Sequence, residues 1–195
     1  IKLFKARLGS VNCKKGGILV PIKVVEIHPS YVPKKPGYDV ALLKLASPVN
    51  YTELIAPIAL SKTRGRVLSA KFITTYWPRL IVKGQVLPAI AKERFKQNSM
   101  RVSPQMMIPR EKCEKIMQKN NVTLEYSSLC LEPIVSHHTP CMPDPGAPVV
   151  AKDGLWGTTS GWTAKDCSNS PTMFTRLSSP KVTSWLQLIL VDLVL

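Results

Sequence analysis

The chain has 195 residues, enough for one domain with a substantial hydrophobic core or for two small domains. Its 27 lysines and arginines stand against 12 acids, and the resulting formal net charge of +15 favours anionic partners through a long-range, salt-sensitive field. The sequence contains no apolar run of about 18 residues, which excludes an ordinary transmembrane helix.

The positive charge is concentrated in one part of the sequence. Fourteen of the 27 basic residues lie between Lys62 and Lys119, a segment with only three acids. One interpretation is a solvated basic face, and the other is a site for a heparin-like glycan, an anionic lipid or lipopolysaccharide. No basic motif with interleaved aromatic residues and no recognition helix accompanies the charge, so nucleic acid is not expected as a partner.

The five cysteines are scattered along the chain, and none has the Cys-x-x-Cys spacing of a metal or redox site. Scattered cysteines suit disulfides and an oxidising compartment. Two possible glycosylation sequons, at Asn50 and Asn121, agree with a secretory route. We therefore expect an extracellular protein with no metal and no other cofactor. The stretch Ile1–Lys5 lacks the apolar middle region of a signal peptide.

The first part of the chain predicts short strands separated by turns rich in proline and glycine. Strands are expected over Ile1–Leu8, Ile18–Ile27 and Tyr38–Leu45, with a polar turn over Ser10–Gly17 and a loop over His28–Tyr38. Pro21 indicates an edge or a bulge in the second of these strands. This pattern favours an all-β barrel or sandwich.

Two helices are predicted further along. Ile108–Asn120 begins with Pro109 in its first turn and places Cys113, Ile116 and Met117 on one face. Near the end of the chain, Ser179 is a plausible cap, and apolar residues recur at helical spacing at Val182, Trp185, Leu186, Ile189, Leu190 and Leu193. One packing face does not need all the apolar residues of Val191–Leu195, so a membrane contact or an interface is the alternative to core packing.

The stretch Cys141–Val150 resembles the nucleophile loop of trypsin-like serine proteases, Cys-x-Gly-Asp-Ser-Gly-Gly-Pro-[Val/Leu]-Val. Pro145 stands where that family has its nucleophilic serine, and Pro143 stands where it has a glycine. The backbone N–H groups of that glycine and serine form the oxyanion hole, and proline has no N–H. Losing one such donor costs roughly 100- to 1000-fold in rate. The resemblance therefore implies a catalytically degenerate member of the family.

A second stretch carries the same resemblance. His28-Pro29-Ser30-Tyr31 followed by Tyr38–Leu45 is similar to the family's His-Pro-x-[Tyr/Phe] and its triad-aspartate strand, with Asp39 at the aspartate. The family's histidine motif, Ala-Ala-His-Cys, and its first strands would precede Arg7, and we expect them to lie outside this chain. His28 is interpreted as structural. Asp144, which pairs with the freed N-terminal amine in active members, is expected to bind local backbone N–H groups.

The resemblance also implies a division of the chain. The fold expected is all-β, with two six-stranded Greek-key barrels of the chymotrypsin type, the first incomplete at its N-terminus, and a C-terminal α-helix. The single trypsin-like domain spans 1–195, with a partial first barrel over 1–55, a crossover over 56–71, a second barrel over 72–178 and a helix over 179–195.

Matching positions imply the disulfides Cys113–Cys130 and Cys141–Cys167, which leaves Cys13 unpaired. A third family disulfide is replaced, because Phe72 and Ala151 stand at its two cysteines and a bulky residue facing a small one fills the space. The resemblance places Thr139 at the acid in the base of the specificity pocket, and Trp162 and Thr172 at wall glycines, where a side chain should fill the pocket. A one-residue slip that puts the Trp162 ring nearer the family's position is the alternative.

Other catalytic sets are not favoured. His137 and His138 near Cys141 suggest a metal site or a Cys/His pair, but the resemblance makes Cys141 half of a disulfide. Ser128, Ser136 and Ser160 lie in ordinary loop or strand settings.

Three functions remain. The first is a secreted binding, decoy or cofactor protein, with a protein or an anionic glycan as its partner. The second is a serine endopeptidase, the activity of the family, which Pro143 and Pro145 oppose. The third is a truncated product without independent function, which predicts poor solubility and no cooperative unfolding.

Overall fold

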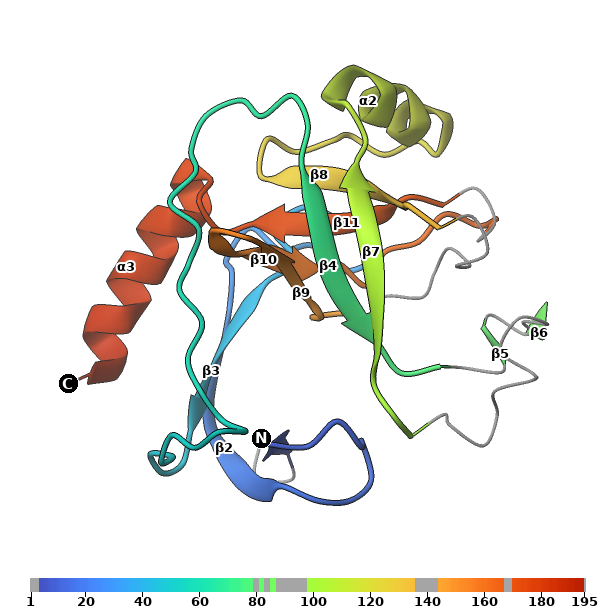
Figure 1. Ribbon diagram of the computed structural model, residues 1–195. Coiled ribbons are helices and arrows are strands. Elements are labelled where there is room, and N and C mark those ends of the chain that lie inside the picture. Colours follow the sequence, from blue (N-terminus) through green and yellow to red (C-terminus); the bar gives the residue numbers. More distant parts are fainter. Residues whose placement is uncertain are drawn as a thin grey trace.

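In the computed structural model, a closed barrel packs beside a smaller open sheet, and a long helix lies along one side (Figure 1). The structure describes residues 4–78, 81–82, 85–86, 98–135, 144–166 and 170–194. Among these residues, no helix is long and apolar enough to cross a membrane.

The barrel is six-stranded and antiparallel, with its strands in the order β10-β11-β8-β7-β4-β9. Its strands are β4 (Lys71–Tyr76), β7 (Arg101–Met107), β8 (Ser128–Pro133), β9 (Pro148–Ala151), β10 (Gly154–Thr159) and β11 (Thr172–Arg176). Alternate residues of β4 point inward, so Phe72, Thr74 and Tyr76 are buried while Ile73 is half exposed. This period of two is what a strand with one buried face requires.

The open sheet has three strands, β1 (Lys5–Leu8), β2 (Ile18–Ile27) and β3 (Ala41–Leu45), in sequence order. A register shift between Ile22 and Val24 gives β2 its irregularity, close to Pro21. A short separate hairpin pairs β5 (Ile81–Val82) with β6 (Gln85–Val86). The all-β fold class is confirmed, with a three-stranded sheet where an incomplete first barrel was expected.

Both predicted helices are present, as α2 (Arg110–Lys119) and α3 (Pro180–Val194). Pro109 occupies the N-cap position of α2, and Cys113 and Met117 are buried on its inner face. Ser179 does not cap α3 with its side chain as we expected. Its hydroxyl donates to the carbonyl of Arg176 (2.8 Å), while its own carbonyl accepts from the N–H of Thr183 (2.9 Å).

Buried side chains form separate clusters in the barrel, beneath α2 and beneath α3. Phe72 lies in the barrel cluster with an exposed fraction of 2%, in edge contact with the rings of Trp156 and Phe174, and Ala151 packs against the same cluster. The aromatic ring therefore occupies the space between these two strands. Tyr38 and Val40, just before β3, pack with Val182 and Trp185 of α3.

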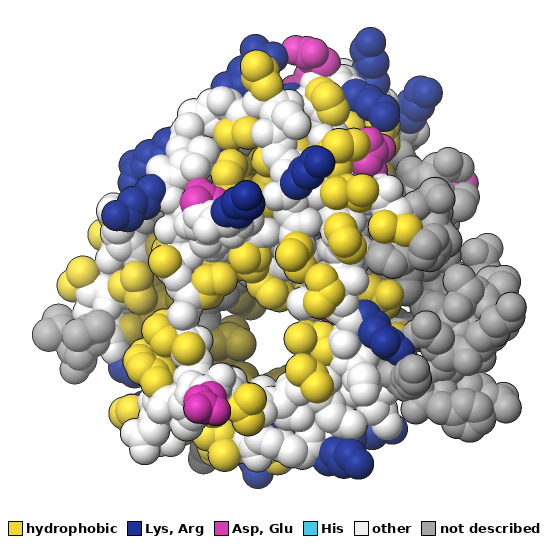
Figure 2. Space-filling model, viewed as in Figure 1, with side chains coloured by type: hydrophobic (Ala, Val, Ile, Leu, Met, Phe, Trp, Pro, Cys, Tyr) yellow, Lys and Arg dark blue, Asp and Glu magenta, His cyan; other side chains and the backbone are white. Residues whose placement is uncertain are grey.

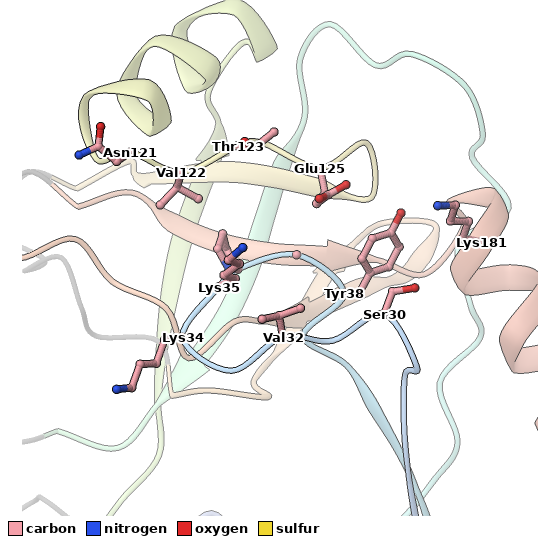
Figure 3. A pocket seen from close by; sticks show the side chains of 12 residues that line it. Ser30, Val32, Lys34, Lys35, Tyr38, Asn121, Val122, Thr123, Glu125 and Lys181 are labelled. Carbon is pink, nitrogen blue, oxygen red and sulfur yellow. The ribbon is translucent and has the colours of Figure 1, made fainter.

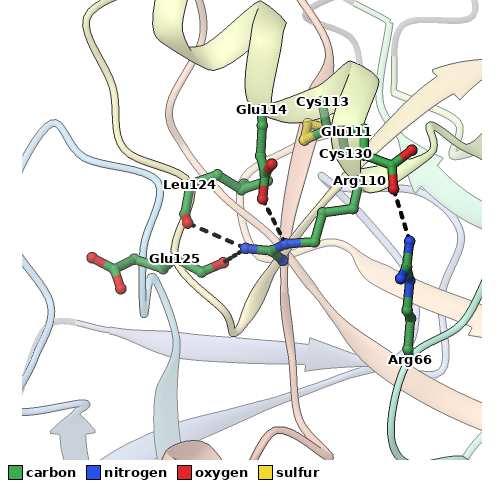
Figure 4. Close-up of polar contacts among 8 residues, drawn as sticks. All are labelled: Arg66, Arg110, Glu111, Cys113, Glu114, Leu124, Glu125 and Cys130. Carbon is green, nitrogen blue, oxygen red and sulfur yellow. Dashed lines mark hydrogen bonds and ion pairs between the residues drawn. A yellow bond between two sulfur atoms is a disulfide. The ribbon is translucent and has the colours of Figure 1, made fainter.

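The segment after α2 is fastened by a disulfide and an arginine (Figure 4). Cys113 of α2 is bonded to Cys130 of β8, as the resemblance implied. Arg110 donates to the carboxylate of Glu114 and to the backbone carbonyls of Leu124 and Glu125. These bonds fix residues 121–125 against the barrel.

Candidate functional site

Asp39 is oriented by hydrogen bonds from residues that are distant in the sequence. It lies two residues before the start of β3, and its Oδ2 accepts a hydrogen bond from the hydroxyl of Ser160 (2.6 Å) and another from the N–H of Gly161 (2.8 Å). These partners follow β10 of the barrel, 121 and 122 residues along the chain. The carboxylate therefore joins the open sheet to the barrel.

Pro145 lies beside this pair. A Cβ added at Gly161 would be 3.6 Å from the Cβ of Pro145 and 3.8 Å from the Oδ2 of Asp39. Pro145, which lies near Asp39 across Gly161, is a saturated ring without a hydroxyl. A side chain that can neither donate a proton nor attack a carbonyl carbon offers no nucleophile at this point.

The N–H groups of the loop around Pro145 are committed to intramolecular bonds. Gly146 donates to the carbonyl of Thr159 (2.8 Å), and Ala147 donates to the carbonyl of Asp144 (2.9 Å) and to Oγ1 of Thr159 (3.0 Å). Pro145 has no N–H to offer. An oxyanion hole needs free donors aimed at the developing charge, and residues 145–147 present none.

The carboxylate of Asp144 also has a backbone partner. Its Oδ2 accepts a hydrogen bond from the N–H of Trp77 (2.8 Å), just after β4. This partner is a backbone N–H group, as predicted, but it lies 67 residues away in the sequence and is not local.

His28 does not take part in a catalytic arrangement. It is 3% exposed, its ring stacks on Tyr38 at a centroid distance of 4.8 Å, and Trp185 lies 5.0 Å away on another side. Its Nδ1 accepts from the N–H of Ser30. Burial is the main cause that lowers the pKa of His28. The structural interpretation of this histidine agrees with its position.

A cleft of about 400 Å³ opens between the sheet and the Pro145 loop. Ile27, Leu43 and Tyr31 line one side, and Pro145 and Thr158 line the other. Figure 2 shows that the molecule is hollowed between sheet and barrel, with hydrophobic side chains around the opening. The surface facing Asp39 is therefore mainly apolar, with Asp39 and Tyr31 as the titratable groups among its described lining residues.

A polar network holds the crossover against the barrel. Asp153, in the turn between β9 and β10, accepts hydrogen bonds from the hydroxyls of Ser61 and Thr63 and from the indole N–H of Trp156. These donors, Ser61 foremost, lower the pKa of Asp153 to about 2. Arg176 donates to the carbonyls of Thr63 (2.9 Å) and Gly65 (2.6 Å).

The remaining predicted site residues fall into two groups. Several lie outside the described residues: Thr139, Cys141, Pro143, Cys167, His137 and His138. Trp162 is half-buried against the cluster beneath α2, and Thr172 begins β11. Cys13 is an exposed free thiol, and the sequon residues Asn50 and Asn121 are both exposed. Among described residues, no group of three metal-binding side chains occurs.

Sequence reasoning missed the role of Ser160, which we had placed in an ordinary strand setting. Its hydroxyl donates to Asp39, and it also accepts from the N–H of Trp162 (3.1 Å). Its place in the stretch Ser160-Gly161-Trp162, which resembles the family's Ser-Trp-Gly, was the available signal.

Comparisons with known proteins agree with the barrel fold described above. The Trypsin family model matches residues 2–186. Among curated relatives, the chain is 27% identical to a trypsin of Sarcophaga bullata over 94% of this chain and 67% of that protein. It is 30% identical to Hypodermin-A of Hypoderma lineatum over 80% of this chain and 56% of that protein.

Solved structures share the fold. Neuropsin, a serine protease expressed in the limbic system of mouse brain, superposes with a TM-score of 0.75 at 19% identity, covering 95% of this chain and 78% of its own. A structure of the protein GrC gives a TM-score of 0.72, also at 19% identity, covering 93% of this chain and 75% of its own.

Proposed function

Because the chain belongs to the trypsin family, we propose that it is a non-catalytic member, a secreted binding, decoy or cofactor protein whose partner is a protein or an anionic glycan. The observation that supports the proposal is the Pro145 ring, which lines one cleft with Asp39 and stands at the sequence position where the family has its nucleophile. The loop amides that remain, on Gly146 and Ala147, are already used within the protein.

The proposal that the partner is an anionic glycan rests on the positive charge of the chain. A formal net charge of +15 creates a field that concentrates polyanions at the surface. Figure 2 shows lysine and arginine side chains over the upper part of the molecule, around α2, with acidic side chains among them. Lys112 and Glu132 form one of the few ion pairs of the described residues there, at 3.7 Å.

Secretion is supported by the Cys113–Cys130 bridge, which suits an oxidising compartment, and by the exposure of both sequon asparagines. Expression through a secretory host followed by peptide-N-glycosidase treatment tests this part. We expect the treatment to lower the apparent mass of the protein. The drop should be smaller in each of the Asn50→Gln and Asn121→Gln variants.

The alternative is a serine endopeptidase. Labelling of the intact protein with a fluorophosphonate probe separates the two, with an active trypsin as the positive control. We expect no covalent adduct, and a stoichiometric adduct would overturn the proposal.

A Pro145→Ser variant sharpens the test. Returning the hydroxyl still leaves Pro143 without an N–H and leaves His28, the one described histidine, buried against Trp185. We expect this variant to remain unlabelled as well. Labelling of Pro145→Ser alone would show that the other parts of the machinery are intact and that a single residue silences the protein.

A further inference from the structure

A groove of about 590 Å³ is lined by neither Asp39 nor Pro145. Its size falls within the range of about 300–1,000 Å³ that is common for ligand sites. One wall is the loop from Ser30 to Tyr38, the facing wall is the segment 121–125, and α3 closes one end with Lys181 (Figure 3). Residues from three distant parts of the chain therefore meet there.

The groove is positively charged. Three lysines, Lys34, Lys35 and Lys181, line it against one acid, Glu125. All three are exposed, and within the described part of the chain none of them has an ion-pair partner. Lys119 comes two residues before Asn121 on the facing wall, which extends the positive charge toward α2.

A second cluster of cations has a different character. The pocket beneath α2 is lined by three arginines, but it also contains Glu111 and Glu114. These two carboxylates pair with Arg66 and Arg110 at 2.8 and 2.9 Å (Figure 4). Its charge is largely compensated within the protein, whereas that of the lysine groove is not.

The walls of the lysine groove have a fixed shape. The backbone of Gly37 approaches Glu125 so closely that an added Cβ would lie 2.5 Å from its Cγ. The three non-glycine residues with a left-handed backbone in the described chain, Lys34, Tyr38 and Asn121, all line this groove. Arg110 binds the carbonyls of Leu124 and Glu125 and so holds the far wall. A preformed site loses less entropy on binding.

We propose that this lysine groove binds a sulfated polysaccharide chain of the heparin type, an inference that rests on the proposed binding function and locates its site. The three ammonium groups match sulfate groups, since charge-assisted hydrogen bonds to such anions are strong. Neutral hydrogen-bonding groups on Ser30 and Thr123 suit sugar hydroxyls, and the end of the groove away from α3 admits a polymer. A concave site favours a chain over the flat surface of a membrane.

The test compares two triple variants with the same change in charge. The first, Lys34→Gln/Lys35→Gln/Lys181→Gln, removes the cations of the groove. The control, Lys14→Gln/Lys15→Gln/Lys23→Gln, removes three exposed lysines from the β1–β2 turn and from β2. Binding of the full chain to a heparin oligosaccharide is measured by titration calorimetry at several salt concentrations, and thermal unfolding checks that both variants fold.

We expect the groove variant to lose about 5- to 100-fold in affinity, because each exposed charge contact contributes less than a tenfold factor. The control should lose less than threefold, and the salt dependence of binding should become shallower in the groove variant alone. Fully desulfated heparin should not bind either protein.

Each of the other possible results would refute a specific part of the proposal. Equal losses in the two variants would reduce binding to bulk charge and would refute the groove. Heparin binding that resists the groove substitutions but falls with Lys112→Gln/Lys115→Gln would keep the proposed function and refute this site. No binding by the unmodified protein beyond a charge-matched protein would refute both. Groove-dependent binding to phosphatidylserine vesicles but not to heparin would replace the glycan by a lipid.

Discussion

Replacing Phe72 with alanine should destabilise the barrel strongly. The ring is 2% exposed, and its centroid lies 5.1 Å from that of Trp156 and 5.6 Å from that of Phe174. Truncating a buried phenylalanine typically costs about 3–5 kcal/mol. Since a whole domain is stable by only about 5–15 kcal/mol, the variant should lose a large part of its unfolding free energy.

The neighbouring residue on β4 provides a matched control. Ile73 is 50% exposed and points away from the barrel interior, so Ile73→Ala should cost about 1 kcal/mol or less. Urea unfolding followed by circular dichroism and tryptophan fluorescence measures both values, with the slope m checked for constancy. If Phe72→Ala costs no more than Ile73→Ala, the ring does not replace the missing bridge by packing.

A double variant tests the same reasoning in the other direction. The pairing of Ile73 with Val150 places position 72 opposite Ala151, so Phe72→Cys/Ala151→Cys introduces two facing cysteines. The bridge would add about 2–4 kcal/mol, and loss of the ring would remove about 3–5 kcal/mol. The oxidised variant should therefore be no more than about 1 kcal/mol more stable than the native protein.

Three further predictions concern pH and the disulfide. Burial lowers the pKa of His28 in the folded state below the value of about 6.5 expected when the chain is unfolded. The contribution of neutral His28 to stability should therefore be fully present above that pH and should fall as the pH drops below it. His28→Gln should flatten this part of the plot of urea midpoint against pH, and an unchanged plot would contradict the assignment. The pKa of Asp153 is lowered to about 2 in the folded state, so its contribution to stability is present above the pKa of the unfolded chain and is lost as pH falls through about 2. Asp153→Asn should weaken the loss of stability in acid. It should also speed hydrogen exchange of the backbone amides in the crossover near Ser61, measured by mass spectrometry. Removing the Cys113–Cys130 bridge as a double alanine variant should cost about 3 kcal/mol for a loop of this length, seen as a lower thermal midpoint, and a shift of less than 2 °C would show that Arg110 alone holds the segment.

The local sequence pattern was sufficient to predict several strands and helices. The β-branched run of Ile18–Ile27 forms a strand with those bounds, and the spacing of Cys113 and Met117 gives the buried face of α2. In such stretches, propensity and burial act over a few neighbouring residues.

Contacts between distant segments were beyond that reach. The bonds from Ser160 and Gly161 to Asp39 cross more than 120 residues, and only the packing of sheet on barrel brings them together. The basic segment 62–119 drew attention in the sequence, yet the three lysines of the groove all lie outside it. A charge count along the chain carries no information on which loops share a wall.

The contact between α3 and the sheet has a consequence for biosynthesis. Tyr38 and Val40 pack against Val182 and Trp185, which are synthesised more than 140 residues later. This apolar patch is thus expected to stay open to chaperones until the α3 segment has been made. Lys181 belongs to the same helix, so the groove is completed at the same late stage.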